Sequence, residues 1–222
     1  MEGGLVHHFP VHWLGTDVFL DTVGMTWLTM AVLILFTWLA VRRLTLVPTG
    51  SQNFLETVIE YFQDLAKSML GEEGKKMTPL LFTLFLFLTV SNLWGMIPTL
   101  TSPTNDLNTT FGIALISVLG VYVLGVYRKG WGYFKHLAEP MWFMIPMNVL
   151  DELIRPLTLA LRLFVNILVG EVLLIVLYDL CPWFIPVAWL LMSVLIGVIQ
   201  AFVFTLLTTS YYGEVFATEE HE

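Results

Sequence analysis

The sequence contains few charged residues. Only 13% of its 222 residues are Asp, Glu, Lys or Arg, whereas 57% are hydrophobic and the mean hydropathy is +0.78. A soluble domain carries roughly 25% charged residues, so this composition excludes an ordinary soluble globular protein. Four stretches contain no charged residue at all: Thr22–Val41, Met77–Asn105, Leu107–Tyr127 and Leu180–Gly213. Each of them is long enough to cross a bilayer as a helix.

Cysteine and clustered positive charge are also scarce. The single cysteine, Cys181, cannot form an internal disulfide, and no zinc-type spacing of Cys and His is present. We therefore expect no disulfide, no metal site and no cofactor. The formal net charge of −8 argues against nucleic acid as a partner, because nucleic acid is bound by clustered Lys and Arg. The apolar stretches instead indicate membrane lipid as the surroundings.

The charged residues that are present lie mainly between the apolar stretches and predict a topology. Residues 1–22 lack the cationic start and the cleavage site of a signal peptide, so we expect them to remain, on the external side of the membrane. The first span, residues 23–48, contains the apolar run Val23–Val41, which is followed by Arg42 and Arg43. By the positive-inside rule, this pair places the end of the first span in the cytoplasm.

Residues 49–76 carry charged and apolar side chains at helical spacing, which predicts an amphipathic helix at the cytoplasmic face. Its charges favour a solvated face, and its apolar stripe also suits a partner helix. Residues 79–127 predict a helical hairpin. Its connecting loop, Thr101–Thr110, has no Lys or Arg and is expected to be external. The basic cluster at 128–135 then returns the chain to the cytoplasm.

The last part of the membrane region, residues 138–213, predicts two long helices with a lead-in. The lead-in, Ala138–Asn148, is interrupted by two prolines, which predicts an interfacial or re-entrant piece. Helical patterns then run over Asp151–Leu180 and Val187–Tyr212, and the acidic tail, residues 214–222, is expected in the cytoplasm.

The whole chain, residues 1–222, is thus predicted to be one all-α polytopic transmembrane domain. We expect about five membrane-crossing helices and one amphipathic surface helix, with the last two crossings the longest.

An arginine lies in the middle of the first long helical pattern. An arginine near the bilayer centre costs about 2.5–3.5 kcal/mol on insertion scales and cannot lose its proton, so Arg162 must face protein, water or a counter-charge. It either joins two helices as an interior arginine or takes part in an ion pathway. Asn166 lies one turn away on nearly the same face, whereas Glu171 points to roughly the opposite side, about 13 Å along the axis. Arg162 and Glu171 are therefore not an obvious ion pair.

Four other polar residues in the two long helical patterns also need an explanation. Asp151 and Glu152 lie where a helix is expected to begin, so they either stabilise the helix dipole or form the acidic mouth of an aqueous pathway. Arg155, beside Pro156, is expected to snorkel to the membrane interface. Gln200 lies in an uncharged helix and needs a partner, for which an interhelical hydrogen bond is the simplest interpretation.

The run Arg155–Glu171, RPLTLALRLFVNILVGE, resembles the signature of subunit a of F-type ATP synthases. Ser91–Pro98 resembles the end of that family's second span and Gln200–Phe204 its last helix, so the resemblance covers nearly the whole chain. Matched by position, Arg162 is similar to the family's essential arginine and Asn166 to its nearby asparagine. Glu171 matches the channel glutamate, and Gln200 matches the glutamine of the last helix.

An acidic pair also resembles the family, whereas two positions differ from its usual sequence. Asp151 and Glu152 resemble the pair that lines the cytoplasmic access path. Val165 stands where the family usually has glycine, which changes how closely a neighbouring helix approaches. Ser193 stands where some members have histidine. We therefore expect Glu171 to work with water, Ser193 or Asp179 in place of a histidine.

The resemblance implies a proton-conducting stator subunit of a rotary ATP synthase, with no catalytic chemistry in this chain. Two offset half-channels would face a ring of c subunits, and Arg162 would separate them. Glu171, Asn166 and Ser193 would line the external half-channel, and Asp151 and Glu152 the cytoplasmic one. The two long helices would lie strongly tilted along the rotor. The implied partners are the c-subunit ring, the b-subunit peripheral stalk and the F1 ATPase sector, in a bacterial cell membrane.

A stand-alone ion channel or secondary transporter is the alternative function, although no internal repeat supports a transporter built from inverted halves. A membrane haem or redox enzyme is disfavoured because every histidine lies outside the apolar spans: His7, His8, His12, His136 and His221. An intramembrane hydrolase is disfavoured because Ser193 has no nearby His or Lys in the pattern to act as a base.

Overall fold

The computed structural model describes residues 10–13, 16–42, 50–96, 102–130, 145–181 and 184–217. Parts of several predicted features lie outside these residues: the first nine residues of the N-terminal segment, Arg43 and Lys135 of the basic clusters, residues 97–101, residues 138–144 of the lead-in, and the tail from residue 218.

The described chain is almost entirely helical, which confirms the predicted fold class. The α-helices are α1 (Leu20–Val41), α2 (Ser51–Leu70), α3 (Thr78–Trp94), α4 (Leu107–Lys129), α5 (Ile145–Leu180) and α6 (Ile185–Ala217). Two short 3-10 helices, η1 (Glu72–Met77) and η2 (Pro103–Asn105), precede α3 and α4. Strands β1 (Pro10–Trp13) and β2 (Thr16–Phe19) pair antiparallel ahead of α1 and were not predicted.

Five of the described helical segments are long and apolar enough to cross a membrane, which confirms the expected number of crossings. The helix that does not qualify is α2, whose side chains divide by face. Phe62 and Ala66 are buried, whereas Glu60 and Asp64 are exposed. This division is what the helical spacing of charged and apolar residues predicted for the amphipathic segment.

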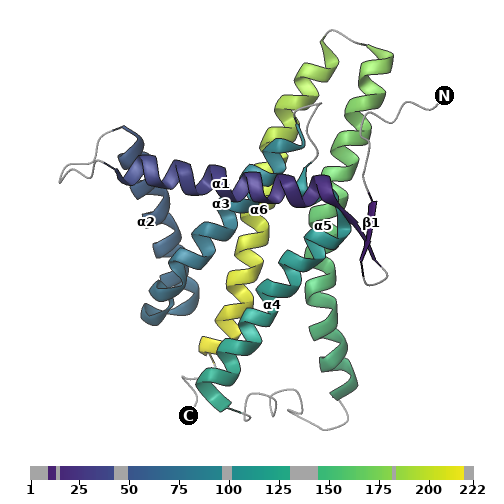
Figure 1. Ribbon diagram of the computed structural model, residues 1–222. Coiled ribbons are helices and arrows are strands. Elements are labelled where there is room, and N and C mark those ends of the chain that lie inside the picture. The colour runs from purple at the N-terminus through teal and green to yellow at the C-terminus, as the bar shows by residue number, and fades with distance from the viewer. Residues whose placement is uncertain are drawn as a thin grey trace.

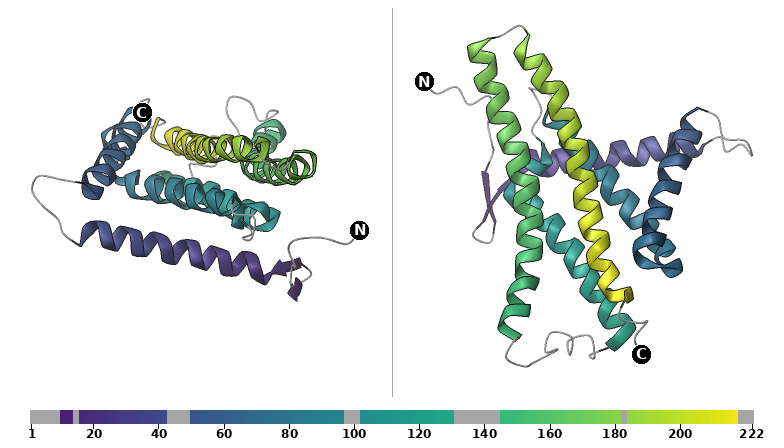
Figure 2. Two further views of the ribbon diagram at one scale, coloured as in Figure 1. Left: turned by 90° about the horizontal axis from the view of Figure 1, so that it is seen from above. Right: turned by 180° about the vertical axis from the view of Figure 1, so that it is seen from behind.

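The helices lie in three layers (Figures 1 and 2). The two longest helices, α5 and α6, run side by side and form one outer layer. Beneath them lie α3 and α4, with α4 packed on α5 and α3 packed on α6. On the far side of this middle layer lies α1, which runs across the long helices. The amphipathic α2 stands at one end of the molecule, packed on α3 and α6.

The two last helices are much longer than a direct crossing requires. They contain 36 and 33 residues, which at about 1.5 Å per residue gives lengths of roughly 50 Å. The hydrocarbon core is only about 30 Å thick, so a helix of this length is accommodated by tilting. With 22 residues, α1 fits the core directly, and it runs across α5 and α6 in Figure 1. This arrangement agrees with the expected tilt.

The start of α5 differs from the sequence-based expectation. The helix begins at Ile145, six residues before the expected start at Asp151, and it continues through Pro156. Pro146 was expected to interrupt the chain, but it falls in the first helical turn, where the missing N–H has no intrahelical partner to lose. The end of the predicted lead-in is therefore part of the long helix.

Two clusters of buried apolar residues hold the layers together. One joins α2, α3, α4 and α6 around Phe62, Leu81 and Tyr212. The other joins α3, α4, α5 and α6 around Leu88, Leu163 and Phe204. The second cluster fixes the rotation of α5 about its own axis, and it thereby decides which of its side chains face outward.

We expect Gly120 of α4 to be required for close packing on α6. A Cβ at this position would lie 2.2 Å from the hydroxyl oxygen of Tyr212, whose side chain is only 3% exposed. Gly120→Ala should therefore destabilise the folded chain by about 1–3 kcal/mol. Gly112 lies on the same helix, and a Cβ there would meet no atom within 4 Å. Thermal unfolding in detergent should show a lower melting temperature for G120A and no loss for G112A; equal values would contradict this packing.

Candidate functional site

Arg162 lies on the outer face of α5. Its neighbours Leu159 and Leu163 point into the core and are 1% and 0% exposed. Arg162 itself is exposed, as are Leu161 and Val165 beside it. No described residue forms a hydrogen bond or ion pair with its guanidinium. Within the described residues, the arginine therefore does not join two helices of this chain. It presents an unneutralised charge on an apolar surface.

A small cavity lies between α3, α5 and α6 and collects three of the predicted site residues. Asn166 and Glu171 come from α5 and Ser193 from α6, and all three line a space of about 100 Å³. Asn92 of α3 and Trp189 of α6 also line it. A cavity of this size that is bordered by polar side chains has room for several water molecules. The structure thus brings Asn166, Glu171 and Ser193 to one place, as expected, although their roles remain predictions.

The hydrogen-bond partner of Glu171 was not among the predicted site residues. The amide Nδ2 of Asn105, in η2, donates to Oε2 of Glu171 at 2.5 Å. The other carboxylate oxygen, Oε1, lies against Gly95, where a Cβ would approach it to 3.3 Å. Of the partners expected for Glu171, Ser193 shares the cavity, whereas Asp179 is exposed two turns further along α5 and does not line it.

A chain of buried polar contacts holds η2 against α3 and α6. Ser102 caps η2 and donates from Oγ to the carbonyl oxygen of Ser91 at 2.8 Å. Thr104 donates to Oδ1 of Asn92 at 3.0 Å, and Nδ2 of Asn92 donates to the carbonyl oxygen of Gly197 at 2.9 Å. The described part of the loop expected on the external side is therefore anchored to the helix bundle. The sequence did not predict these contacts, because turn-forming residues are also typical of solvated loops.

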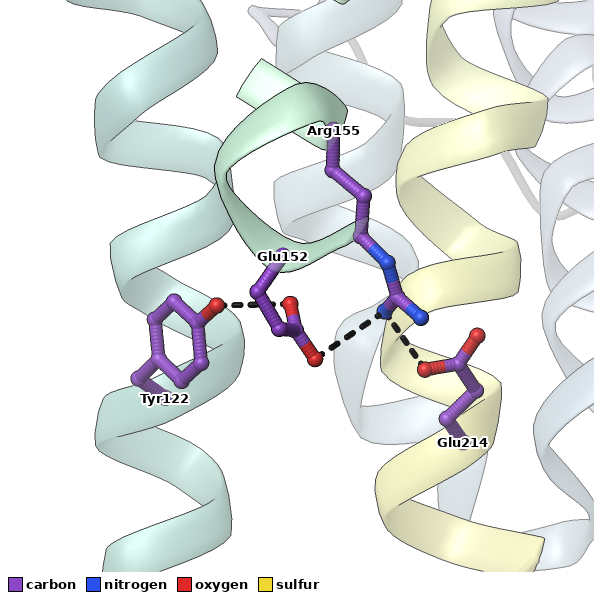
Figure 3. A network of polar contacts seen from close by, with 4 residues as sticks. All are labelled: Tyr122, Glu152, Arg155 and Glu214. Atoms are coloured by element: carbon purple, nitrogen blue, oxygen red, sulfur yellow. Dashed lines mark hydrogen bonds and ion pairs between the residues drawn. The ribbon is translucent and has the colours of Figure 1, made fainter. Parts of the chain in front are cut away.

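A second polar network joins α4, α5 and α6 (Figure 3). The hydroxyl of Tyr122 donates to Oε2 of Glu152 at 2.6 Å. Arg155 pairs with Glu214 of α6 at 2.5 Å and with Oε1 of Glu152 at 3.7 Å, and its guanidinium lies 5.0 Å from the ring centre of Tyr211. Arg155 therefore binds the neighbouring helix α6, a contact that the expectation of a snorkelling arginine did not include.

The remaining two predicted residues lie apart from these networks. Asp151 is exposed on α5, next to Glu152 but outside the contacts of Figure 3. Gln200 of α6 is 9% exposed, and its Nε2 finds no hydrogen-bond partner among the described residues. The next residue, Ala201, packs in the same cluster as Leu159 and Leu163 of α5. Gln200 on α6 and Arg162 on α5 are thus each next in sequence to a residue of this cluster.

Together these features define a class of protein: a multi-pass helical membrane protein whose two longest helices border a cavity with polar side chains, and whose helix α5 presents an arginine on an exposed face. Residues 23–213 match the family model described as ATP synthase A chain. The chain belongs to this family, that of ATP synthase subunit a, a membrane component of the Fo sector.

Individual relatives support the assignment over most of their length. The ATP synthase subunit a of Moorella thermoacetica is 40% identical over 199 residues, which cover 89% of this chain and 91% of that protein. ATP synthase subunit a 1 of Pelobacter propionicus is 42% identical over 195 residues, with 86% and 85% covered. The chloroplastic subunit a of Oedogonium cardiacum is 41% identical over 207 residues, with 88% and 81% covered. The resemblance inferred from the signature run is thereby confirmed.

Proposed function

We propose that this chain is the proton-conducting stator subunit of a rotary F-type ATP synthase and that it works against a ring of c subunits. The observation that carries the proposal is the position of Arg162. A guanidinium on an exposed apolar face is costly against lipid tails, so the face needs a partner that brings negative charge or water. A ring of helices with a carboxylate at mid-membrane depth meets that need.

In this mechanism Arg162 prevents a direct leak between the two sides of the membrane. Its fixed positive charge favours the ionised form of the rotor carboxylate that passes it, because an opposite charge stabilises an ionised acid. A proton must then enter from one side, travel with the rotor and leave on the other side. Each charge that crosses a potential of 100 mV yields about 2.3 kcal/mol, which the rotor takes up as torque.

The positions of the carboxylates along α5 support two separate access paths. Glu171 lies nine residues after Arg162, about 13 Å along the helix, and Glu152 lies ten residues before it, about 15 Å away. We assign the cavity lined by Asn166, Glu171 and Ser193 to the external half-channel. We assign Glu152 and Asp151 to the cytoplasmic half-channel, and Gln200 to the core beside the arginine.

We further propose a location and an assembly for the chain. Arg42 at the end of α1 and Arg128 near the end of α4 put those helix ends in the cytoplasm by the positive-inside rule, with the N-terminus external and the C-terminus cytoplasmic. The bacterial relatives favour a bacterial cell membrane. ATP chemistry would belong to the F1 sector, held to this chain by the b-subunit stalk.

Disulfide cross-linking tests whether the rotor covers the face of α5 that carries Arg162. In a Cys181→Ser background, Val165→Cys places a thiol one turn from Arg162, at a position that is 47% exposed. Mild oxidation should join it to a cysteine placed beside the rotor carboxylate. The matched control is Ile34→Cys on α1, which is 71% exposed in the opposite outer layer. A product with I34C but none with V165C would overturn the proposed orientation.

A further inference from the structure

We propose that Asn105 is a positioning residue for Glu171 and that its side-chain amide keeps the carboxyl group hydrogen-bonded in both of its protonation states. The inference rests on the proposed role of Glu171 as a proton-carrying group of the external half-channel. It adds a residue from η2 to a site otherwise built by α3, α5 and α6.

The contact is direct and specific. Asn105 Nδ2 lies 2.5 Å from Glu171 Oε2, and within the described chain it is the one hydrogen bond made by that carboxylate. Glu171 borders the cavity that also contains Asn166 and Ser193. The carboxylate is therefore held on one side by the amide, and on another side it borders a space large enough for water. A proton-transfer group requires this combination of a fixed position and access to water.

Asn105 can act as a fixed point because η2 itself is fixed. Ser102 and Thr104, both buried, bind α3 at Ser91 and Asn92, and Asn92 in turn binds the backbone of α6 at Gly197. Gly95 allows this close packing, because a Cβ at this position would lie 2.8 Å from Cβ of Ser102 and would crowd Oε1 of Glu171. The amide is thus aimed at Glu171 by contacts to two other helices.

The amide group suits a carboxyl that gains and loses a proton. An ionised carboxylate only accepts hydrogen bonds, and here it accepts one from Nδ2 of Asn105. A protonated carboxyl also has an O–H donor, which needs an acceptor. The Oδ1 of Asn105 is buried without a hydrogen-bond partner among the described residues. Rotation of the amide about χ2 exchanges Nδ2 and Oδ1, so one side chain serves both states.

The test measures passive proton conduction across the membrane of vesicles that contain the complete membrane sector of the complex, from which F1 has been removed. Asn105→Ala should slow conduction about tenfold or more, because it removes the group that holds Glu171 in place. Asn105→Ser is nearly the same size as the alanine variant and keeps a hydroxyl that both donates and accepts, so it should recover part of the rate. Asn53→Ala, at an exposed position of α2, is the matched control and should conduct normally. Assembly with the c-ring is measured for each variant.

A double-mutant cycle separates a positioning role from a structural one. Glu171→Gln alone should slow conduction at least as much as N105A, and adding N105A to E171Q should then cost little more, because Asn105 acts through Glu171. Losses that multiply in the double variant would overturn the inference, as would a serine variant no faster than the alanine variant. Normal conduction by N105A beside a defective E171Q would overturn this inference alone. Normal conduction by E171Q would overturn the proposed role of Glu171 as well.

Discussion

Arg162→Ala is expected to abolish ATP-driven proton pumping in inverted membrane vesicles, while the F1 sector continues to hydrolyse ATP. In the proposed mechanism, this substitution removes the charge that stabilises an ionised carboxylate on the rotor. The two access paths are then no longer separated by a fixed charge. We expect pumping, followed by the quenching of a pH-sensitive dye, to fall to background. The large effect follows from the isolation of this residue, which has no described partner to share its role.

Two further arginine variants test whether the effect depends on the guanidinium group and on its position in the chain. Arg162→Lys keeps the positive charge but loses the planar group with five donors, so it should restore little pumping. Arg42→Ala removes an exposed arginine at the end of α1, far along the chain from the long helices, and should pump normally. Pumping by R162A at the rate of R42A would show that Arg162 has no part in proton transport.

The sequence predicted the spans well, because four of the five are marked by a long uncharged run. The observed α1, α3 and α4 begin and end within about five residues of the predicted boundaries where those boundaries are described. The less accurate boundaries arise from local chemistry. Pro146 looked like a helix breaker, but at the start of α5 it costs nothing. The β1–β2 hairpin was missed because a short strand pair has no extended apolar pattern.

The site was only partly predictable, for a physical reason. Helical periodicity relates residues of one helix, so it correctly placed Arg162 and Glu171 on different sides of α5. It contains no information on which residue of a neighbouring helix lies opposite. The contacts of Asn105 with Glu171, and of Arg155 with Glu214, depend on how the apolar clusters pack the layers. Asn105 also lies in a loop whose composition is typical of solvent-exposed turns.

The purified chain alone, reconstituted in liposomes, is expected to conduct no protons. The cavity of about 100 Å³ beside Glu171 and the network around Glu152 lie on either side of Arg162 along α5, and the proposed mechanism has no path between them within one chain. A proton would have to pass an exposed guanidinium, which repels it. In the proposed mechanism, an added c-ring supplies carboxylates that carry protons past this point, so the same chain should then conduct at a rate far above background.

Reconstitution with and without the c-ring is therefore the most direct test. A potassium gradient with valinomycin sets the potential, and a pH dye trapped inside the liposomes records proton entry. The proposed mechanism predicts background entry for the chain alone and for the ring alone, and rapid entry for the two together. Rapid entry through the chain alone would contradict it and would identify a stand-alone channel.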